Sequence, residues 1–161
     1  MHGHARSRVA AVCALLLTTL ARPAAADVIS STLDATVPPQ GTFYFSQATG
    51  HMSARIVRDG LIGRCGEARD FPGTEWPGTY RYDSFTFTAT ETTCLGVKLR
   101  LAGGTGNLQF AAYTSFSPSD PSSGWLGDSG LSTGNPGTDT AFSLSVIAGQ
   151  TYTLVVFNIN A

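Results

Sequence analysis

The sequence predicts an all-β protein, an antiparallel β-sandwich of jelly-roll type. Apolar residues alternate with polar ones in several short segments, and turn-forming Gly, Pro, Asn and Ser separate these segments. No segment keeps the apolar period of about 3.6 residues that marks an amphipathic helix. Both observations favour two facing sheets over a helical fold.

Several segments carry the strand pattern. In the clearest, 82–88, Phe85 and Phe87 share one face. The segment 150–157 is apolar on both faces, so we expect a central strand with a neighbour on each side. We expect residues 148–150 to form a tight turn that joins the last two strands as a hairpin. The predicted strands are 28–33, 41–47, 52–57, 82–88, 95–101, 107–113, 142–146 and 150–157.

Two long segments, 66–80 and 115–139, are rich in Gly, Pro, Ser and Asp and are predicted to be loops. Both are longer than most connections in compact domains, so each is either functional or held in place by local contacts. Residues 27–161 contain no repeat, linker or second domain, and we interpret them as one domain.

The first 26 residues have the pattern of a secretory signal peptide. Arg6 and Arg8 precede an uncharged apolar run, and the small residues 24–26 offer a cleavage site before Asp27. No later segment approaches the roughly 18 apolar residues of a membrane span. We therefore expect a secreted, extracellular or periplasmic protein.

After loss of the signal peptide the chain is mildly acidic. Seven Lys and Arg remain against eleven Asp and Glu, which gives a net charge of −4. A nucleic-acid partner would require a basic surface, so this class is disfavoured, as is electrostatic binding to membranes. We expect the partner to be an extracellular polymer or a protein surface.

The cysteines that follow the signal peptide are Cys65 and Cys94. In an oxidising compartment such a pair is a candidate disulfide, and closing this loop would stabilise the fold by roughly 3–4 kcal/mol. The sequence does not show whether the two residues are adjacent in space, so a bridge and free thiols both remain open.

Short motifs along the chain follow a recognisable order. They are Arg55-x-x-Arg58-Asp59-Gly60, Cys65, Pro72-Gly73, Tyr82-Asp83-x-Phe85-Thr86-Phe87, Cys94, Ala111-Ala112-Tyr113, Phe116-x-Pro118, Trp125-Leu126-Gly127-Asp128 and Ala148-Gly149-Gln150-Thr151. In this order they resemble the bacterial pre-peptidase C-terminal (PPC-like) domains, small secreted jelly-roll sandwiches appended to extracellular peptidases. The resemblance covers nearly all of residues 27–161. It implies a non-catalytic module that binds, adheres or stabilises outside the cell.

The chain departs from that family pattern in two places. Relatives carry a further cysteine just before the Pro-Gly, where this chain has Phe71. They also continue past the equivalent of Asn158 into one more strand, so we expect either a naturally shortened domain or a truncated gene model. Both departures leave open whether Cys65 pairs with Cys94.

A dense group of charges lies around the 82–88 strand. One interpretation is a ligand contact. The other, which we favour, is a structural clamp in which arginine and aspartate side chains hold the 66–80 loop against the sheet through bidentate hydrogen bonds. The clamp residues are Arg55, Arg58, Asp59, Arg81 and Asp83.

The tetrapeptide 127–130, Gly-Asp-Ser-Gly, matches the sequence around the nucleophile of chymotrypsin-like serine proteases. That chemistry also needs a histidine base, a buried carboxylate and an oxyanion hole. His51 is the one histidine that follows the signal peptide. We interpret the tetrapeptide as a turn capped by Asp128 and expect no catalytic residues. A small hydrolase using Ser129 and His51 is the weaker alternative.

Calcium is a candidate cofactor, because Asp120, Asp128 and Asp139 lie in or beside one long Gly/Ser-rich loop. Calcium takes six to eight oxygen ligands and often finds them in such loops. The alternative is that all three are solvated loop acids.

Four aromatic residues are candidate ligand contacts, which would make the chain a carbohydrate-binding module or give it an anchor for a protein partner. Alternatively, they cover the open ends of the sandwich. They are Trp76, Tyr80, Tyr113 and Trp125.

Overall fold

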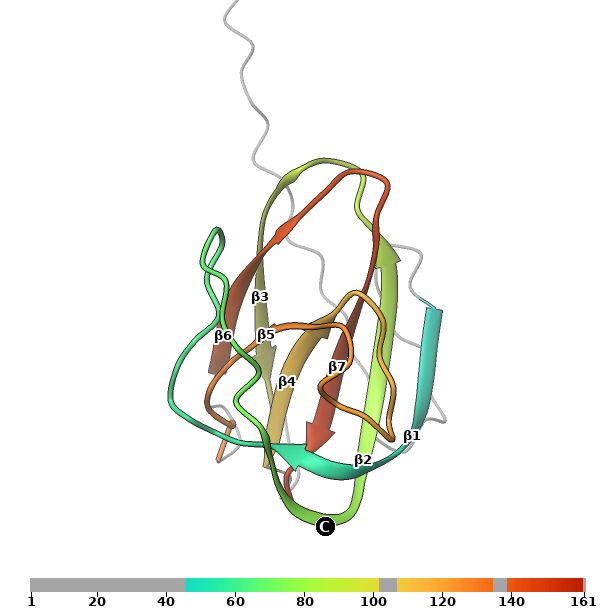
Figure 1. Cartoon of the computed structure of the whole chain (residues 1–161), viewed down its shortest axis with the longest axis vertical. Helices are drawn as coiled ribbons and strands as arrows, with labels where there is room; N and C mark the ends of the chain where they lie inside the picture. The colour runs from blue at the N-terminus through green and yellow to red at the C-terminus, as the bar shows by residue number, and fades with distance from the viewer. Residues whose placement is uncertain (1–45, 102–106, 135–138, 161) are drawn as a thin grey trace, which may run out of the picture.

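The computed structural model describes residues 46–101, 107–134 and 139–160, which form two antiparallel sheets packed face to face (Figure 1). The predicted β-sandwich is confirmed. The larger sheet has five strands in the order β1-β2-β7-β4-β5, and the smaller sheet pairs β3 with β6. The strands are β1 (Ser46–Ile56), β2 (Thr74–Thr88), β3 (Thr93–Arg100), β4 (Leu108–Tyr113), β5 (Trp125–Asp128), β6 (Asp139–Val146) and β7 (Thr151–Asn158).

Parts of the sequence-based prediction fall outside the described residues. These parts are the strand 28–33 and the first residues of the strand 41–47. Within the described part of the chain, no helix has the length and apolar character to cross a membrane.

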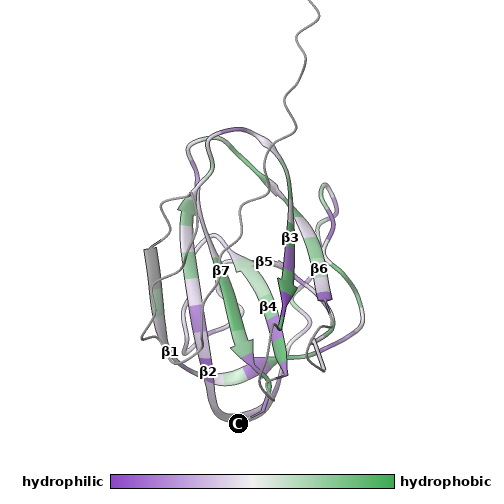
Figure 2. Ribbon diagram, turned by 180° about the vertical axis from the view of Figure 1, so that it is seen from behind, coloured by the Kyte–Doolittle hydropathy of each residue, from purple (hydrophilic) through white to green (hydrophobic). Residues whose placement is uncertain are grey.

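The strand β7 lies at the centre of the larger sheet, between β2 and β4, as its apolar faces predicted. Leu154 on one face and Val155 and Phe157 on the other are buried. Figure 2 shows the hydrophobic character of this strand along most of its length. The neighbours on both sides satisfy its backbone hydrogen bonds, which a strand covered on both faces needs.

The main core lies between the two sheets. Period-2 alternation sends one face of each strand inward, and each fully buried side chain of this size contributes about 1.5–3 kcal/mol. Its buried members are Phe85, Ala89, Phe110, Ala112, Phe142, Leu144, Val146, Tyr152 and Leu154.

A second apolar cluster covers the outer face of the larger sheet. Met52, Ile56, Tyr113, Val155 and Phe157 are among its buried members. The segment 57–73, which we call the strap, covers part of this face, and its Phe71 packs there. Both faces of the larger sheet are therefore buried, which explains why β4 is buried along its whole length.

Two connections cross between the sheets side by side, one from β2 to β3 and one from β6 to β7 (Figure 1). The amide of Ala89 donates to the carbonyl of Gln150 at 2.9 Å, and the amide of Gly149 donates to the carbonyl of Ala89 at 2.8 Å. The predicted hairpin between the last two strands is therefore wrong. The tight turn exists, but it carries the chain from one sheet to the other because β7 pairs with β2 and β4.

The predicted loops also contain strand. β2 begins at Thr74, inside the segment expected to be a loop up to Tyr80, and β5 lies inside the expected loop 115–139. Neither segment has the alternation that marks a strand. β5 has the sequence Trp-Leu-Gly-Asp, and the start of β2 contains Pro77 and Gly78, both of which are depleted in strands.

Candidate functional site

Trp76 occupies an irregular position in the pairing of β1 with β2. The consecutive residues Ala54 and Arg55 pair with Pro77 and Glu75, so Trp76 is an extra residue on β2. Its φ is 53°, in the left-handed region, and no other described non-glycine residue has a positive φ. A left-handed residue with a side chain costs about 1–2 kcal/mol. A bulge of this kind redirects a side chain, and 66% of the Trp76 surface is exposed.

The contacts around the bulge hold its backbone in place. The Tyr80 hydroxyl donates to the Trp76 carbonyl at 2.8 Å. Arg55 forms an ion pair with Glu75 at 3.2 Å and donates to the carbonyl of Ile159 at 3.0 Å. Both partners of the ion pair are partly buried, which favours the pair over a fully solvated one. The bulge is therefore a fixed feature of the fold.

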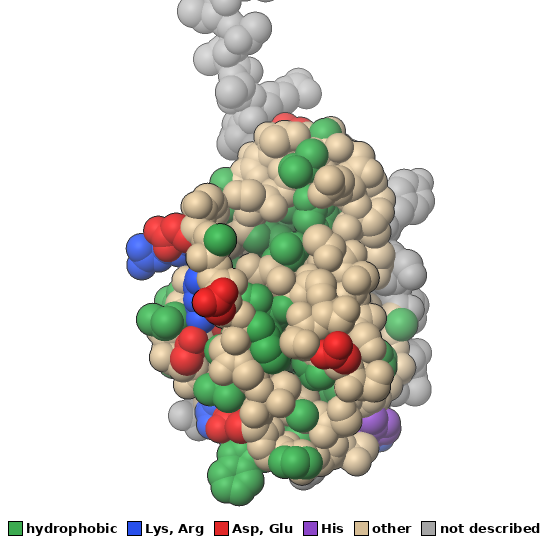
Figure 3. All heavy atoms as spheres, in the orientation of Figure 1, with side chains coloured by type: hydrophobic (Ala, Val, Ile, Leu, Met, Phe, Trp, Pro, Cys, Tyr) green, Lys and Arg blue, Asp and Glu red, His purple; other side chains and the backbone are tan. Residues whose placement is uncertain are grey.

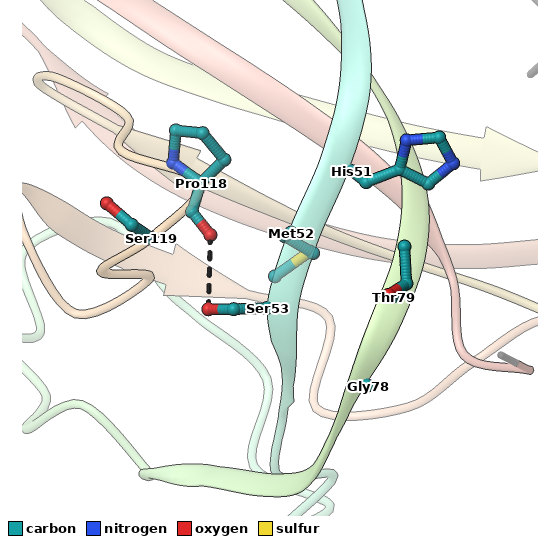
Figure 4. A pocket seen from close by; sticks show the side chains of 7 residues that line it. All are labelled: His51, Met52, Ser53, Gly78, Thr79, Pro118 and Ser119. Atoms are coloured by element: carbon teal, nitrogen blue, oxygen red, sulfur yellow. Dashed lines mark hydrogen bonds between the residues drawn. The ribbon is translucent and has the colours of Figure 1, made fainter.

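A shallow hollow of about 300 Å³ lies between β1, the start of β2 and the loop after β4. Gly78, which lines the hollow, lies two residues after Trp76 in the sequence. Figure 4 shows the Ser53 hydroxyl facing the carbonyl of Pro118, to which it donates a hydrogen bond at 3.4 Å. The lining residues are His51, Met52, Ser53, Gly78, Thr79, Pro118 and Ser119.

The other aromatic candidates are less accessible than Trp76. Tyr80 and Tyr113 are buried, with 4% and 0% of their surface exposed, so no ligand reaches their rings. Trp125 is half-buried, in edge contact with Phe71 at a ring-centroid distance of 5.7 Å. Tyr80 and Tyr113 are therefore wrong as candidate ligand contacts, and Trp76 is the most exposed of the four.

The strap bridges the two sheets along one side of the sandwich. The amide of Gly63 donates to the carbonyl of Asp128 in β5 at 2.9 Å, and the carbonyl of Gly63 accepts from the amide of Ser143 in β6 at 2.9 Å. A disulfide joins Cys65 of the strap to Cys94 of β3, which settles the pairing that the sequence left open. Figure 3 shows acidic and basic side chains gathered on the side of the molecule where the strap lies.

Gly130 allows the strap to approach β5 closely. Its φ is +61°, and a Cβ atom at this position would lie 2.4 Å from the carbonyl oxygen of Leu61. The carbonyl of Gly130 accepts a hydrogen bond from the amide of Gly60 at 3.0 Å. Close packing against the strap therefore explains why residue 130, the second glycine of the Gly-Asp-Ser-Gly sequence, is a glycine.

Asp128 is fully buried under the strap. Burial raises its pKa from 3.8 to about 6, against the opposing effects of the Gly130 amide and the Arg69 guanidinium. One carboxylate oxygen accepts a hydrogen bond from the Gly130 amide, so the predicted capping turn is present. Burial, and then the nearby Asp128 charge, raise the pKa of Tyr113.

Three of the predicted clamp residues, Arg55, Arg58 and Asp59, have separate partners. Asp59 pairs with Arg69 at 2.7 Å, while Arg58 donates to the Ser132 hydroxyl at 3.1 Å. Arg81 is exposed and Asp83 is buried in β2.

Sequence reasoning missed Arg69, the cation that organises the strap. Besides its pair with Asp59, it donates to the Leu61 carbonyl at 2.5 Å and lies over the Trp125 ring at 5.6 Å. Arg69 follows Asp59 by ten residues, close enough to suggest an ion pair. However, the sequence does not favour Arg69 over Arg64 as the partner.

The acids proposed as calcium ligands have separate environments. Asp120 accepts from the amide and hydroxyl of Ser122, which lower its pKa. Asp139 pairs with Arg100 and Lys98, which lower its pKa as well. No group of three or more His, Cys, Asp or Glu side chains gathers within the described residues.

Ser129 and His51, the residues of the hydrolase alternative, lie toward opposite edges of the larger sheet. His51 is on β1, Ser129 directly follows β5, and three strands separate β1 from β5. At about 4.8 Å per strand the separation is roughly 19 Å, far beyond a hydrogen bond. Ser129 is also buried, and its hydroxyl donates to the Leu131 carbonyl at 2.6 Å.

Comparison of the chain with protein-family models, curated protein sequences and solved structures gives no match.

Proposed function

We propose that this chain is a secreted, non-catalytic binding module that contacts its extracellular partner through Trp76. One observation carries the proposal: a tryptophan with 66% of its surface exposed is held at a left-handed bulge position. Strained backbone that persists in a fold is often found at ligand contacts. Tryptophan is also among the residue types that dominate binding energy at interfaces.

Two features support a location outside the cytoplasm. Disulfides such as Cys65–Cys94 are typical of secreted proteins and rare in the cytosol. The first 26 residues have the composition of a secretory signal. The motif order that resembles the PPC-like domains favours the same class of function, an accessory module of secreted hydrolases or of the cell surface.

The hollow beside the bulge favours a neutral polysaccharide as the ligand class. An exposed indole can stack on a sugar ring, and the hollow is lined by Ser53, Thr79 and Ser119, whose hydroxyls can bond sugar hydroxyls. The one ion pair described at the bulge, Arg55–Glu75, is internal to the fold, so the proposed contact rests on the indole and the hydroxyls and not on charge.

The experiment is a pull-down of the purified chain on insoluble cellulose, chitin and peptidoglycan. Trp76→Ala should reduce retention on one of them by about tenfold or more. Leu61→Ala is the matched control, because Leu61 is 60% exposed but lies on the strap. Equal retention of Trp76→Ala and the unaltered chain would contradict the proposed contact. Retention on none of the three would exclude these polysaccharides.

The secretion proposal has its own test. Expression of the full chain in a bacterium with a Sec pathway should yield a periplasmic or extracellular product whose N-terminal residue is Asp27. A product that keeps Met1 and stays in the cytoplasm would overturn it.

A further inference from the structure

Asp128 is buried beneath a short section of the strap, residues 59–63, which we call the cover. Two backbone hydrogen bonds hold the cover to β5 and to the turn that follows it. The amide of Gly60 donates to the carbonyl of Gly130 at 3.0 Å, and the amide of Gly63 donates to the carbonyl of Asp128 at 2.9 Å. The cover is therefore a thin layer of chain over a buried acid.

The cover has the features of a segment that opens locally. Gly60 has a φ of +77°, and nothing lies within 4 Å of the position that its Cβ would take, so no neighbour blocks rotation there. Leu61 is 60% exposed and adds little to the core. A third hydrogen bond joins Ser143 to Gly63, and beyond it the disulfide of Cys65 fixes the strap. With few buried apolar contacts, opening of the cover should cost less than global unfolding.

The surroundings of Asp128 oppose its ionisation. One carboxylate oxygen accepts from the Gly130 amide, and the other is buried without a well-formed hydrogen bond. The Trp125 indole on β5 favours the ionised form weakly, and the Tyr113 hydroxyl on β4 lies within electrostatic reach. Burial outweighs these contacts and raises the pKa of Asp128 to about 6.

Arg69 links the ionisation of Asp128 to the cover. Its guanidinium pairs with Asp59 at 2.7 Å and donates to the Leu61 carbonyl at 2.5 Å, and both partners belong to the cover. The same guanidinium lies over the Trp125 ring at 5.6 Å, so it ties the cover to β5. The charge of Arg69 also favours an ionised Asp128, whereas the charge of Asp59 opposes it. An ionised Asp128 therefore competes with Asp59 for Arg69 and repels the Asp59 carboxylate.

We propose that the cover is a pH-dependent latch, closed over Asp128 while this carboxyl carries a proton and open when it ionises. Opening gives the carboxylate water and returns its pKa toward the ordinary 3.8. Because the closed form has the higher pKa, the latch is tightest below about pH 4, loosens as the pH rises to about 6, and changes little above. It lies at the β5 edge of the larger sheet, whereas Trp76 lies beside β1 at the other edge, so it is independent of the proposed polysaccharide contact.

Hydrogen exchange of single amides, followed by NMR, tests the role of Asp128. Between pH 4 and pH 7 the protection of the Gly60 and Gly63 amides, corrected for intrinsic exchange, should fall by about fiftyfold. In Asp128→Asn, the matched variant with no charge to gain, the same amides should change by no more than about threefold. An unchanged protection in the unaltered chain, or an equal fall in Asp128→Asn, would overturn the proposal.

A second measurement on the unaltered chain alone shows whether the opening is local. At pH 7, the Gly60 and Gly63 amides should exchange at least about tenfold faster than the amide of Val155, which lies buried at the centre of the larger sheet. Urea below the unfolding midpoint should accelerate exchange at Val155 but not in the cover, because opening of the cover exposes little surface. The same protection and the same urea dependence at all three amides would mean that only global unfolding exposes Asp128, and would overturn the latch.

Discussion

The two long sides of this sandwich are built differently. On the strap side, hydrogen bonds from Gly60 and Gly63, the Asp59–Arg69 pair and the Cys65–Cys94 disulfide join the two sheets. The disulfide reaches β3 at Cys94, but beyond it β3 pairs only with β6 within the described residues, and Leu95 and Val97 remain half-buried. Local stability should therefore fall along β3 with distance from Cys94.

Removal of the disulfide should have the largest effect on stability among the tests of this difference. Replacing both cysteines by serine frees the strap from β3 and should lower the free energy of unfolding by about 3–4 kcal/mol. Urea unfolding with and without a reductant measures the change, and the reductant should affect only the unaltered chain. An effect below about 1 kcal/mol would mean that the strap is held by its hydrogen bonds alone.

A matched pair of leucines compares the two sides directly. Leu144 and Leu95 are opposite each other in β6 and β3, but Leu144 is 5% exposed and Leu95 is half-buried. Leu144→Ala should cost about 3 kcal/mol and Leu95→Ala about 1 kcal/mol, measured by urea unfolding. Equal costs would remove the contrast between the two sides.

Asp128 makes the strap side sensitive to pH. Its pKa in the fold, about 6, is above its ordinary 3.8, so between these values the folded chain binds more protons than the unfolded chain. This group therefore stabilises the fold most below about pH 4, and the contribution falls as the pH rises to about 6 and is flat above. Asp128→Asn should remove a fall of up to about 3 kcal/mol. Unfolding at several pH values between 4 and 7 measures it. Parallel pH profiles for the two proteins would contradict this assignment.

Two arginines of the strap should differ in their contribution to stability. Arg69→Ala loses an ion pair, a hydrogen bond to Leu61 and a contact with Trp125, at a cost of about 1–2 kcal/mol. Arg58→Ala loses one exposed hydrogen bond to Ser132 and should cost no more than about 0.5 kcal/mol. Thermal unfolding in low and high salt would separate the charge effect. A larger loss of stability from Arg58→Ala than from Arg69→Ala would contradict this account and support the clamp predicted from the sequence.

The sequence predicted the elements whose patterns are local. The central position of β7 followed from apolar residues on both faces, and the β4 and β6 segments followed from alternation. It did not predict β5, a strand of four residues whose pairing depends on β4 and the strap. It also did not predict that the tight turn before β7 changes sheets, because a turn does not specify the partner of the next strand.

The candidate site was predictable only in part. Trp76 stood out as a loop tryptophan between turn residues, but its bulge arises from the unequal register of β1 and β2. The burial of Tyr80 and Tyr113 likewise depends on which face of the sheet the strap and loops cover. Both effects depend on contacts between segments far apart in the sequence, which residue type and spacing do not predict.

We propose that the bulge at Trp76 serves binding and not stability. Trp76→Gly tests it most directly, because glycine adopts a left-handed φ without strain. Unfolding in urea should show a variant that is as stable as the unaltered chain or up to about 1 kcal/mol more stable, and the same preparation should lose retention on the polysaccharide that the unaltered chain binds. A loss of stability greater than about 1 kcal/mol with retained binding would contradict the account, because Trp76 would then be a structural residue.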